Sequence, residues 1–258
     1  AGDPDVAAAP GPWPGPGAGT TGSDAGAPGP DAPGLGRSGI TNATALALAH
    51  ARATDDRSYT VWYDYRGPHE DYPNEPRVHL DVDMRAEGDR YTVVESVVRG
   101  ESRRPVRREY YDGEDWYVAR ARGGNTSYLA WPAEGGEPTF GPDPFTLRRG
   151  LVVYYLSTPE TNVTGRVERD GEKRYRVVGR GAPVAPAFDE VEDYRFVALV
   201  DDRGFVRSLT VEYVRTVDGR RAPVRIEIGY DRVGTTTVRP PPWYERRFGD
   251  ATAAPPDG

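Results

Sequence analysis

The sequence predicts a mainly β domain of the α+β class: a strongly curved antiparallel sheet or half-barrel of up-and-down hairpins, covered by two short helices. Two observations predict it. Apolar and polar residues alternate along many segments, as in RVHLDVDMR (77–85), which is the period of a strand with one buried face. Turn dipeptides such as Asp112-Gly113 and Asp218-Gly219 separate these segments. We therefore expect each strand to pair with its neighbour in the sequence.

The N-terminal segment differs from the rest in composition. The first 36 residues contain 10 Gly, 8 Pro and 8 Ala, which leaves too few core-forming residues for packing. We predict a disordered tether over 1–37, a single domain over 38–248 and a disordered tail over 249–258.

Two helices are predicted. Thr41 is the expected N-cap of a helix over 41–53, in the Ala- and Leu-rich stretch TNATALALAHARAT. Asp143-Pro144 is an N-cap followed by proline at the first helical position, and it opens a second helix over 144–156. The helices are the available cover for the apolar face of the sheet.

The predicted strands follow in order along the chain. They are SYTVWYDYR (58–66), RVHLDVDMR (77–85), RYTVVESVV (90–98), the hairpin VRREYYDGEDWYVARA (106–121), TGRVERD (164–170), KRYRVVGR (173–180), YRFVALVDD (194–202), FVRSLTVEYVR (205–215) and PVRIEIGYD (223–231). After them, Pro240 to Pro242 cannot donate to a ladder, so the last strand must end there or run along an edge. We expect Trp243 to fold over that exposed border; the alternative is a polyproline II ligand for a partner domain.

Charge and composition exclude several classes of function. The 40 acidic residues outnumber the 33 basic ones, and they are dispersed, so we expect no nucleic-acid partner. The clusters Arg103-Arg104 and Arg107-Arg108 alternate with Glu101 and Glu109, which indicates cross-strand charge pairing on a wet face rather than phosphate binding. The absence of cysteine excludes disulfides and thiol chemistry. No run approaches the roughly 20 apolar residues that span a bilayer.

Three N-glycosylation sequons begin at Asn42, Asn125 and Asn162. Sequons after a long flexible start are typical of an exported protein held away from a surface, although tripeptides this short also arise by chance. Asn125 is the favoured site, because it follows Gly123-Gly124 in a predicted loop.

The order of a helix ending in HARATDDRSYTVWYDY, the hairpin YYDGEDWYV, a mid-chain helix, then DRGFVRSLTVEYV and TTTVRPPPWY resembles a family of uncharacterised secreted lipoproteins of halophilic archaea. The resemblance covers about residues 38 to 248. Those proteins are similar in architecture to the carriers LolA, LppX and LprG, in which a half-barrel and covering helices enclose an apolar cavity for lipid. The resemblance implies an extracellular, cell-surface protein anchored by a lipid upstream of Ala1; the anchoring cysteine itself is absent from this chain.

The residues that could bind a metal, catalyse a reaction or contact a ligand also fit structural roles. His79, Asp81 and Asp83 share one strand face at a spacing that could hold a hard cation, but a solvated acidic stripe is the favoured interpretation. The three histidines accompany no nucleophile motif, so we predict no catalytic residue, no metal site and no cofactor. The aromatic residues Tyr63, Tyr65, Trp116, Tyr117 and Trp131 could line a sugar-binding or lipid-entry surface, but a structural role is favoured.

The leading hypothesis is a monomeric, non-enzymatic, cell-surface domain that binds a lipid or another apolar ligand in a half-barrel cavity. The expected cavity residues are Val78, Leu80, Val82, Leu209, Val211, Ile226 and Ile228. The alternative is a structural or interaction module of the envelope that binds protein or glycan and has no ligand cavity. A hydrolase with two convergent carboxylates is a minor third hypothesis.

Overall fold

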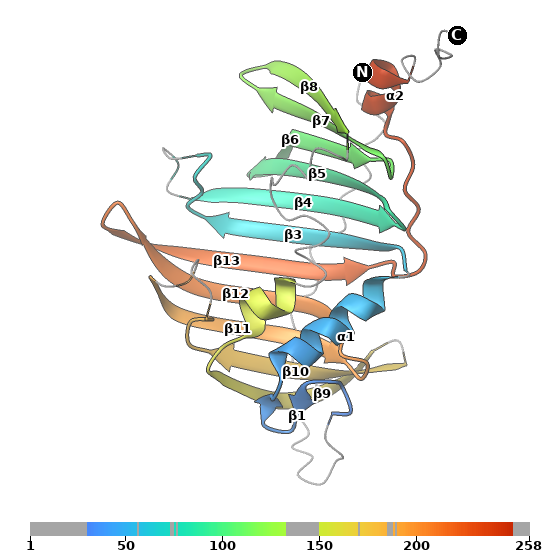
Figure 1. Ribbon diagram of the computed structural model, residues 1–258. Coiled ribbons are helices and arrows are strands. Elements are labelled where there is room, and N and C mark those ends of the chain that lie inside the picture. The colour runs from blue at the N-terminus through green and yellow to red at the C-terminus, as the bar shows by residue number, and fades with distance from the viewer. Residues whose placement is uncertain are drawn as a thin grey trace.

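The computed structural model describes residues 30–55, 57–72, 75, 77–132, 150–169, 171–184, 188 and 190–249. Within these residues, eleven strands form one antiparallel sheet in the order β8-β7-β6-β5-β4-β3-β13-β12-β11-β10-β9 (Figure 1). The strands are β3 (Tyr59–Gly67), β4 (Val78–Glu87), β5 (Arg90–Arg99), β6 (Ser102–Tyr111), β7 (Asp115–Arg122), β8 (Asn125–Pro132), β9 (Glu160–Arg169), β10 (Glu172–Arg180), β11 (Val191–Asp201), β12 (Val206–Val217) and β13 (Arg220–Asp231). The predicted curved antiparallel half-barrel is confirmed.

Two meanders make up the sheet. Strands β3 to β8 pair with their sequence neighbours, and so do strands β9 to β13, as the hairpin turns predicted. The meanders are joined by β13 and β3, whose pairing sets Ile226 opposite Tyr65 and Ile228 opposite Tyr63. The sheet does not close, because β8 and β9 remain its two edges.

Strand β8 is not among the strands predicted from the sequence, and Asn125 lies in it and not in the predicted loop. Gly123 and Gly124 have φ values of 60° and 88° and form a tight turn. The turn ends sooner than expected, so Asn125 is the first residue of β8 and pairs with Arg122. Two-residue turns with positive φ are typical of β-hairpins, so the pair Gly123-Gly124 in the sequence indicates a hairpin at this position.

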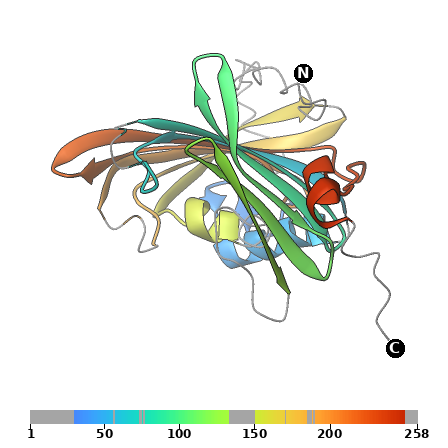
Figure 2. The same cartoon turned by 90° about the horizontal axis from the view of Figure 1, so that it is seen from above.

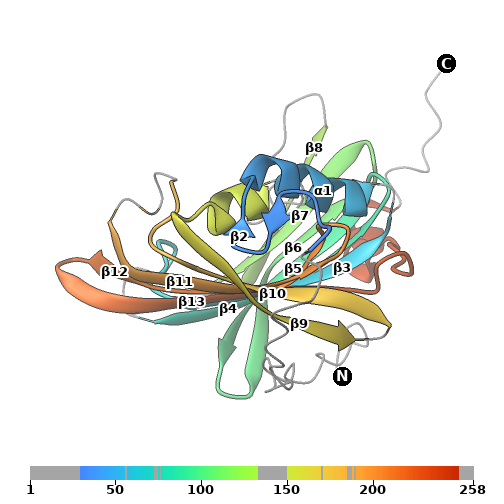
Figure 3. The same ribbon diagram turned by 90° about the horizontal axis from the view of Figure 1, so that it is seen from below.

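Helix α1 (Ala43–Asp55) confirms the first predicted helix. Its cap differs from the prediction: the Ala45 backbone N–H donates to Asn42 Oδ1 at 2.9 Å, whereas the Thr41 hydroxyl donates to the Gly34 carbonyl at 3.3 Å. Of the second predicted helix, the structure describes only a short π-helical segment, η3 (Val152–Leu156). Its predicted start at Asp143-Pro144 lies outside the described residues. Figures 2 and 3 show α1 and η3 together on one face of the sheet, which we call the concave face.

The packed part of the chain begins before residue 38. A two-stranded ribbon of β1 (Leu35–Gly36) and β2 (Gly39–Ile40) precedes α1. Ala32 is 3% exposed and Leu35 is 5% exposed. The Ile40 backbone N–H also donates to Thr161 Oγ1 on β9 at 2.8 Å. The expected tether up to residue 29 and the tail from residue 250 lie outside the described residues.

The main hydrophobic cluster fills the space between the concave face and the two helical segments. It joins residues of α1, such as Leu46, to residues of η3, such as Leu156, and to inward-facing residues of most strands. His50 of α1 is fully buried in this packing: the Val206 backbone N–H donates to its Nδ1 at 3.2 Å, and its Nε2 lies 3.2 Å from the Tyr230 hydroxyl. His50 therefore has a structural role, joining α1 to β12 and β13.

A second cluster covers the opposite face of β6 and β7. It consists of Tyr110, Tyr117, Ala119, Val238, Trp243 and Tyr244. Helix α2 (Pro242–Phe248) carries its last two members, and Pro242 stands at the helix start. The expected edge lock on the last strand is therefore corrected. β13 is a central strand, and the chain after it crosses to the far part of the sheet, where Trp243 stacks on Tyr128 of edge strand β8 at 6.5 Å.

Candidate ligand-binding cleft

A cleft of about 1720 Å³ is lined by residues of β3 to β7, β12, β13 and η3 and by residues 68–72 and 75. The β3–β4 loop, the β7–β8 turn and the β12–β13 turn, which contribute to it, lie at the same end of the sheet (Figure 1). Apolar lining side chains include Leu80, Val82, Val97, Val106, Phe188 and Ile226. The two helical segments therefore cover only part of the concave face, and an apolar part of it remains open.

The structure divides the seven predicted cavity residues into two groups. Leu80, Val82 and Ile226 belong to the main hydrophobic cluster and are 3–4% exposed, and they also line the cleft. Val78, Leu209, Val211 and Ile228 are at most 1% exposed and belong to the packed hydrophobic cluster, not to the cleft lining. All seven face the concave side, as alternation predicted, but alternation cannot show which part of that face the helices cover.

Aromatic side chains form one wall of the cleft. Phe188 lies 4.9 Å from Tyr154 and 5.6 Å from Tyr213, measured between ring centroids. Tyr63 and Tyr155 lie close enough for each to influence the pKa of the other. Burial raises the pKa of both tyrosines well above the usual value of 10, so this wall stays uncharged at neutral pH.

The five aromatic residues singled out in the sequence are not brought together. Tyr63 and Tyr65 line the cleft. Trp116 is packed in the main cluster, where its indole N–H donates to the Tyr91 hydroxyl at 2.7 Å, and Trp131 packs against that cluster. Tyr117 belongs to the cluster on the opposite face. Two of the five are therefore placed to contact a ligand.

A row of charged side chains crosses the concave face on β5, β6 and β7. Arg107 lies 3.7 Å from Glu95 across the strand pair and is also ion-paired with Glu109. Arg120 stands directly opposite Arg107 in the register. Burial raises the pKa of Glu95 and of Glu109, and the guanidinium of Arg107 opposes that shift. The predicted charge pairing of this cluster is divided between the two faces: Arg107 pairs with Glu95 across the strands inside the cleft, whereas Arg103 pairs with Asp81 on the opposite face.

A β-bulge explains why the sequence did not show this. Strict alternation puts Arg104 and Arg107 on opposite faces. In the structure Glu95 pairs with Arg107 and Ser96 pairs with Pro105, so Val106 is an extra residue in β6. Arg104 and Arg107 consequently share the concave face, and both line the cleft.

Arginine dominates the charged lining of the cleft. The lining contains the arginines Arg99, Arg104, Arg107, Arg120, Arg122, Arg215, Arg220 and Arg221, and the carboxylates Glu70, Asp71, Glu75, Glu95 and Asp218. The chain as a whole has the opposite balance, with a formal net charge of −7. The cleft is thus a basic region with an apolar floor in an acidic protein.

The candidate metal ligands His79, Asp81 and Asp83 lie on the face of β4 that points away from the cleft. His79 Nε2 is 2.5 Å from Asp64 Oδ2, and Arg103 donates to Asp81 at 2.6 Å. Burial raises the pKa of Asp83. In the part of the chain that the structure describes, no group of three or more histidine and acidic side chains is placed to hold a metal ion. The expected acidic stripe is therefore a stripe of ion pairs across strands.

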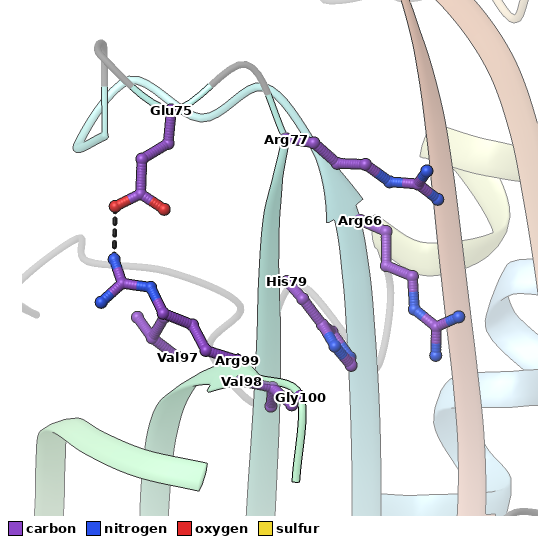
Figure 4. Close-up of a pocket in the computed structure, with 8 residues that line it drawn as sticks. All are labelled: Arg66, Glu75, Arg77, His79, Val97, Val98, Arg99 and Gly100. Carbon is purple, nitrogen blue, oxygen red and sulfur yellow. Dashed lines mark hydrogen bonds and ion pairs between the residues drawn. The ribbon is translucent and has the colours of Figure 1, made fainter. Parts of the chain in front are cut away.

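A smaller hollow of about 440 Å³ lies beside this stripe (Figure 4). Arg66, Arg77 and His79 point into the same region, and an ion pair between Arg99 and Glu75 lies across it. Arg66 is itself 3.0 Å from Asp64. Most of the charged side chains that line this hollow are ion-paired with neighbouring side chains.

All three sequon asparagines are exposed: Asn42 before α1, Asn125 at the start of β8 and Asn162 on edge strand β9. Among the described residues, no helix is long and apolar enough to span a membrane.

Comparison with models of protein families gives no match, and comparison with curated proteins gives none either. Among solved structures, LprF from Mycobacterium bovis is similar, with 14% identity and a TM-score of 0.40 over 78% of this chain and 96% of that chain. A DUF1329 family protein from Desulfovibrio piger is 12% identical, with a TM-score of 0.30 over 80% of this chain and 97% of that one. The Pseudomonas aeruginosa MucA/MucB complex gives 15% identity and a TM-score of 0.34, over 78% of this chain and 59% of that chain. Because these TM-scores are below 0.5, the likenesses carry no argument about what this chain binds.

Proposed function

We propose that this chain is a non-enzymatic binding domain that holds a lipid or another amphipathic ligand in the cleft on its concave face. One observation carries the proposal: about 1720 Å³ of open space whose floor is apolar. Ligand pockets of proteins commonly measure roughly 300–1,000 Å³, so this cleft has room for a ligand larger than a typical small molecule.

The driving force would be removal of apolar surface from water. The half-buried lining residues Tyr63, Val106 and Tyr154 expose surface on which an acyl or isoprenoid chain can replace water, at about 25 cal/mol per Å² of apolar surface buried. Leu80, Val82 and Ile226 also line the cleft, but each is at most 4% exposed. The aromatic wall offers rings that contact a chain on one face and water at the hydroxyl edge.

We further propose that the domain works outside the cell, at a membrane surface to which a lipid upstream of Ala1 anchors it. Such a position would bring the cleft near membrane lipids. The exposed asparagines of the three sequons are compatible with an exported protein.

An envelope module that binds protein is the second candidate, and edge strand β8 is the observation that favours it. Seven of its eight residues are exposed, all except the half-buried Trp131, and Tyr128 and Leu129 are 40% and 42% exposed. An exposed edge can add a strand from a partner. This candidate does not account for the cleft.

The lipid-binding proposal is tested with a fluorescent fatty-acid analogue and the full chain. Val106 lines the cleft and is only half-buried, so V106W should fill the space without disturbing the core. We expect it to weaken probe binding by at least tenfold. The control is V197W on β11, also half-buried and outside the cleft lining, which should bind as the wild type does.

Lipids extracted from the purified protein and identified by mass spectrometry give an independent measurement. A wild-type protein that carries no lipid and does not bind the probe overturns the proposal. Equal loss of binding in both variants also counts against it, because the effect would then not depend on the cleft.

A further inference from the structure

We infer that the ligand of this cleft is an anionic amphiphile, whose negatively charged head group is held by arginines at the rim while its chain lies on the apolar floor. The inference rests on the proposed function, because it names the chemical class of ligand for the same site. Four arginines carry it, which we call the rim arginines: Arg104, Arg122, Arg215 and Arg220.

The rim arginines differ from the other arginines of the cleft in their partners. Arg99 is paired with Glu75, Arg107 with Glu95 and Glu109, and Arg221 with Glu192 at 2.8 Å. Among the described residues, no carboxylate lies within ion-pair distance of the four rim arginines. The excess positive charge of the cleft is therefore located at its rim.

Arginines on the opposite face of the same strands are paired. Arg103, the neighbour of Arg104 on β6, donates to Asp81 at 2.6 Å. Arg225, on the same strand as Arg220, is ion-paired with both Glu212 and Glu227. Among the described residues, carboxylates therefore pair with these outward-facing arginines and with none of the rim arginines.

The positions of the rim arginines suit a head group above an apolar floor. Arg104 stands opposite Val97, which lines the cleft, and Arg122 ends β7 on the same flank. Arg215 and Arg220 lie on the other flank, near the β12–β13 turn, where the guanidinium of Arg215 partly offsets the rise that burial causes in the pKa of Tyr65. Strands β5, β4 and β3 lie between the flanks and provide Leu80 and Val82 to the floor.

The chemistry of arginine specifies the kind of head group. A guanidinium has five N–H donors in a plane and no acceptor, and it binds carboxylate or phosphate through two parallel hydrogen bonds. All four rim arginines are exposed, so their guanidinium groups are accessible to an anion that enters the cleft. A head group with a net negative charge on phosphate or carboxylate would supply that anion, whereas the quaternary ammonium of a phosphocholine head group offsets the charge of its own phosphate.

The test measures binding of two phospholipids with the same pyrene-labelled chains, one with a phosphatidylglycerol and one with a phosphatidylcholine head group. We expect the wild-type chain to bind the anionic lipid at least tenfold more tightly. The double variants R104Q/R122Q and R215Q/R220Q each change one flank. We expect loss of the preference in one or both, with binding of the phosphatidylcholine lipid unchanged.

The matched control is R166Q/R180Q, which removes the same charge from exposed positions on β9 and β10, outside the cleft. It should keep the preference, so that a change in overall net charge cannot explain the result. Loss confined to one double variant would place the head group on that flank.

The outcomes separate this inference from the proposed function. Equal binding of the two lipids by the wild type, or a preference kept in both double variants, overturns the inference and leaves the lipid-binding function standing. If the wild type binds neither lipid, the proposed function fails and the inference fails with it.

Discussion

Glu95 illustrates how burial acts on a single charge in the cleft. Its side chain is 16% exposed, and the nearest cation is Arg107, at 3.7 Å. Loss of solvation is the largest influence on its pKa, and it outweighs the attraction of Arg107, so the pKa lies above the usual value of 4.5. The ionised form of Glu95 is therefore less favourable in the folded chain than in the unfolded one.

The direction of this shift predicts how stability changes with pH. Above about pH 4.5 the unfolded chain releases the Glu95 proton before the folded chain does, so this group's contribution to stability decreases as pH rises through the raised pKa. We expect the wild type to lose stability relative to E95Q between pH 4.5 and pH 7.5. Urea unfolding of both proteins at the two pH values measures the difference.

The control is E101Q, at the exposed β5–β6 turn, whose difference from the wild type should be the same at both pH values. If the wild type instead gains stability relative to E95Q as pH rises, attraction to Arg107 outweighs the cost of burial, and our explanation of the charged row is wrong.

For some residues of the cleft the sheet face could be predicted from the sequence, and for others it could not. Leu80, Val82 and Ile226 could be assigned to the apolar face because their segments alternate strictly. Arg104 could not be assigned to the same face as Arg107, because that placement depends on Val106 being an extra residue in β6. A bulge is set by the pairing of two strands, and neither strand shows it alone.

At the scale of elements, α2 is the part whose role the sequence described least well. The prolines of the C-terminal segment predicted correctly that the ladder ends before them. They did not indicate that residues 232–241 carry the chain from a central strand to β6 and β7, a contact between segments more than a hundred residues apart. Alternation and turn residues report local structure, so they predicted the two meanders but not the joining of β13 to β3.

The packing of α2 predicts a measurable contribution to stability. Trp243 is 8% exposed and lies against Tyr244 and Tyr128. Substitution of a buried tryptophan by alanine costs about 3–5 kcal/mol in a protein core, and Trp243 packs on one face of a sheet, so we expect W243A to lose about 2 kcal/mol. Chemical denaturation followed by circular dichroism gives the value.

The control for this prediction is R246A on the same helix, an exposed residue whose loss should change the free energy of unfolding by less than about 0.5 kcal/mol. A W243A protein as stable as the wild type would mean that α2 covers the outer face of β6 and β7 without stabilising it.

At the scale of the whole molecule, two charge distributions act on an anionic ligand in opposite directions. The net charge of −7 repels the ligand at long range, while the rim arginines attract it at contact. At about 20 Å in water, the unscreened repulsion between that net charge and a single negative charge is about 1.5 kcal/mol. The acidic surface therefore opposes approach to the site that the arginines favour.

Salt separates the two effects. Raising the ionic strength from 0.01 M to 0.1 M shortens the Debye length from about 30 Å to about 10 Å, which removes much of the long-range repulsion and leaves contacts of a few ångströms largely intact. At 1 M the Debye length is about 3 Å, so the arginine contacts weaken as well.

We expect the affinity for a phosphatidylglycerol lipid to rise about twofold between 0.01 M and 0.1 M salt and to fall again by 1 M. The same titration with phosphatidylcholine should show no maximum, because that head group carries no net charge. A steady decrease for phosphatidylglycerol from the lowest salt would show that the field of the cleft, and not the net charge, controls the approach of the ligand.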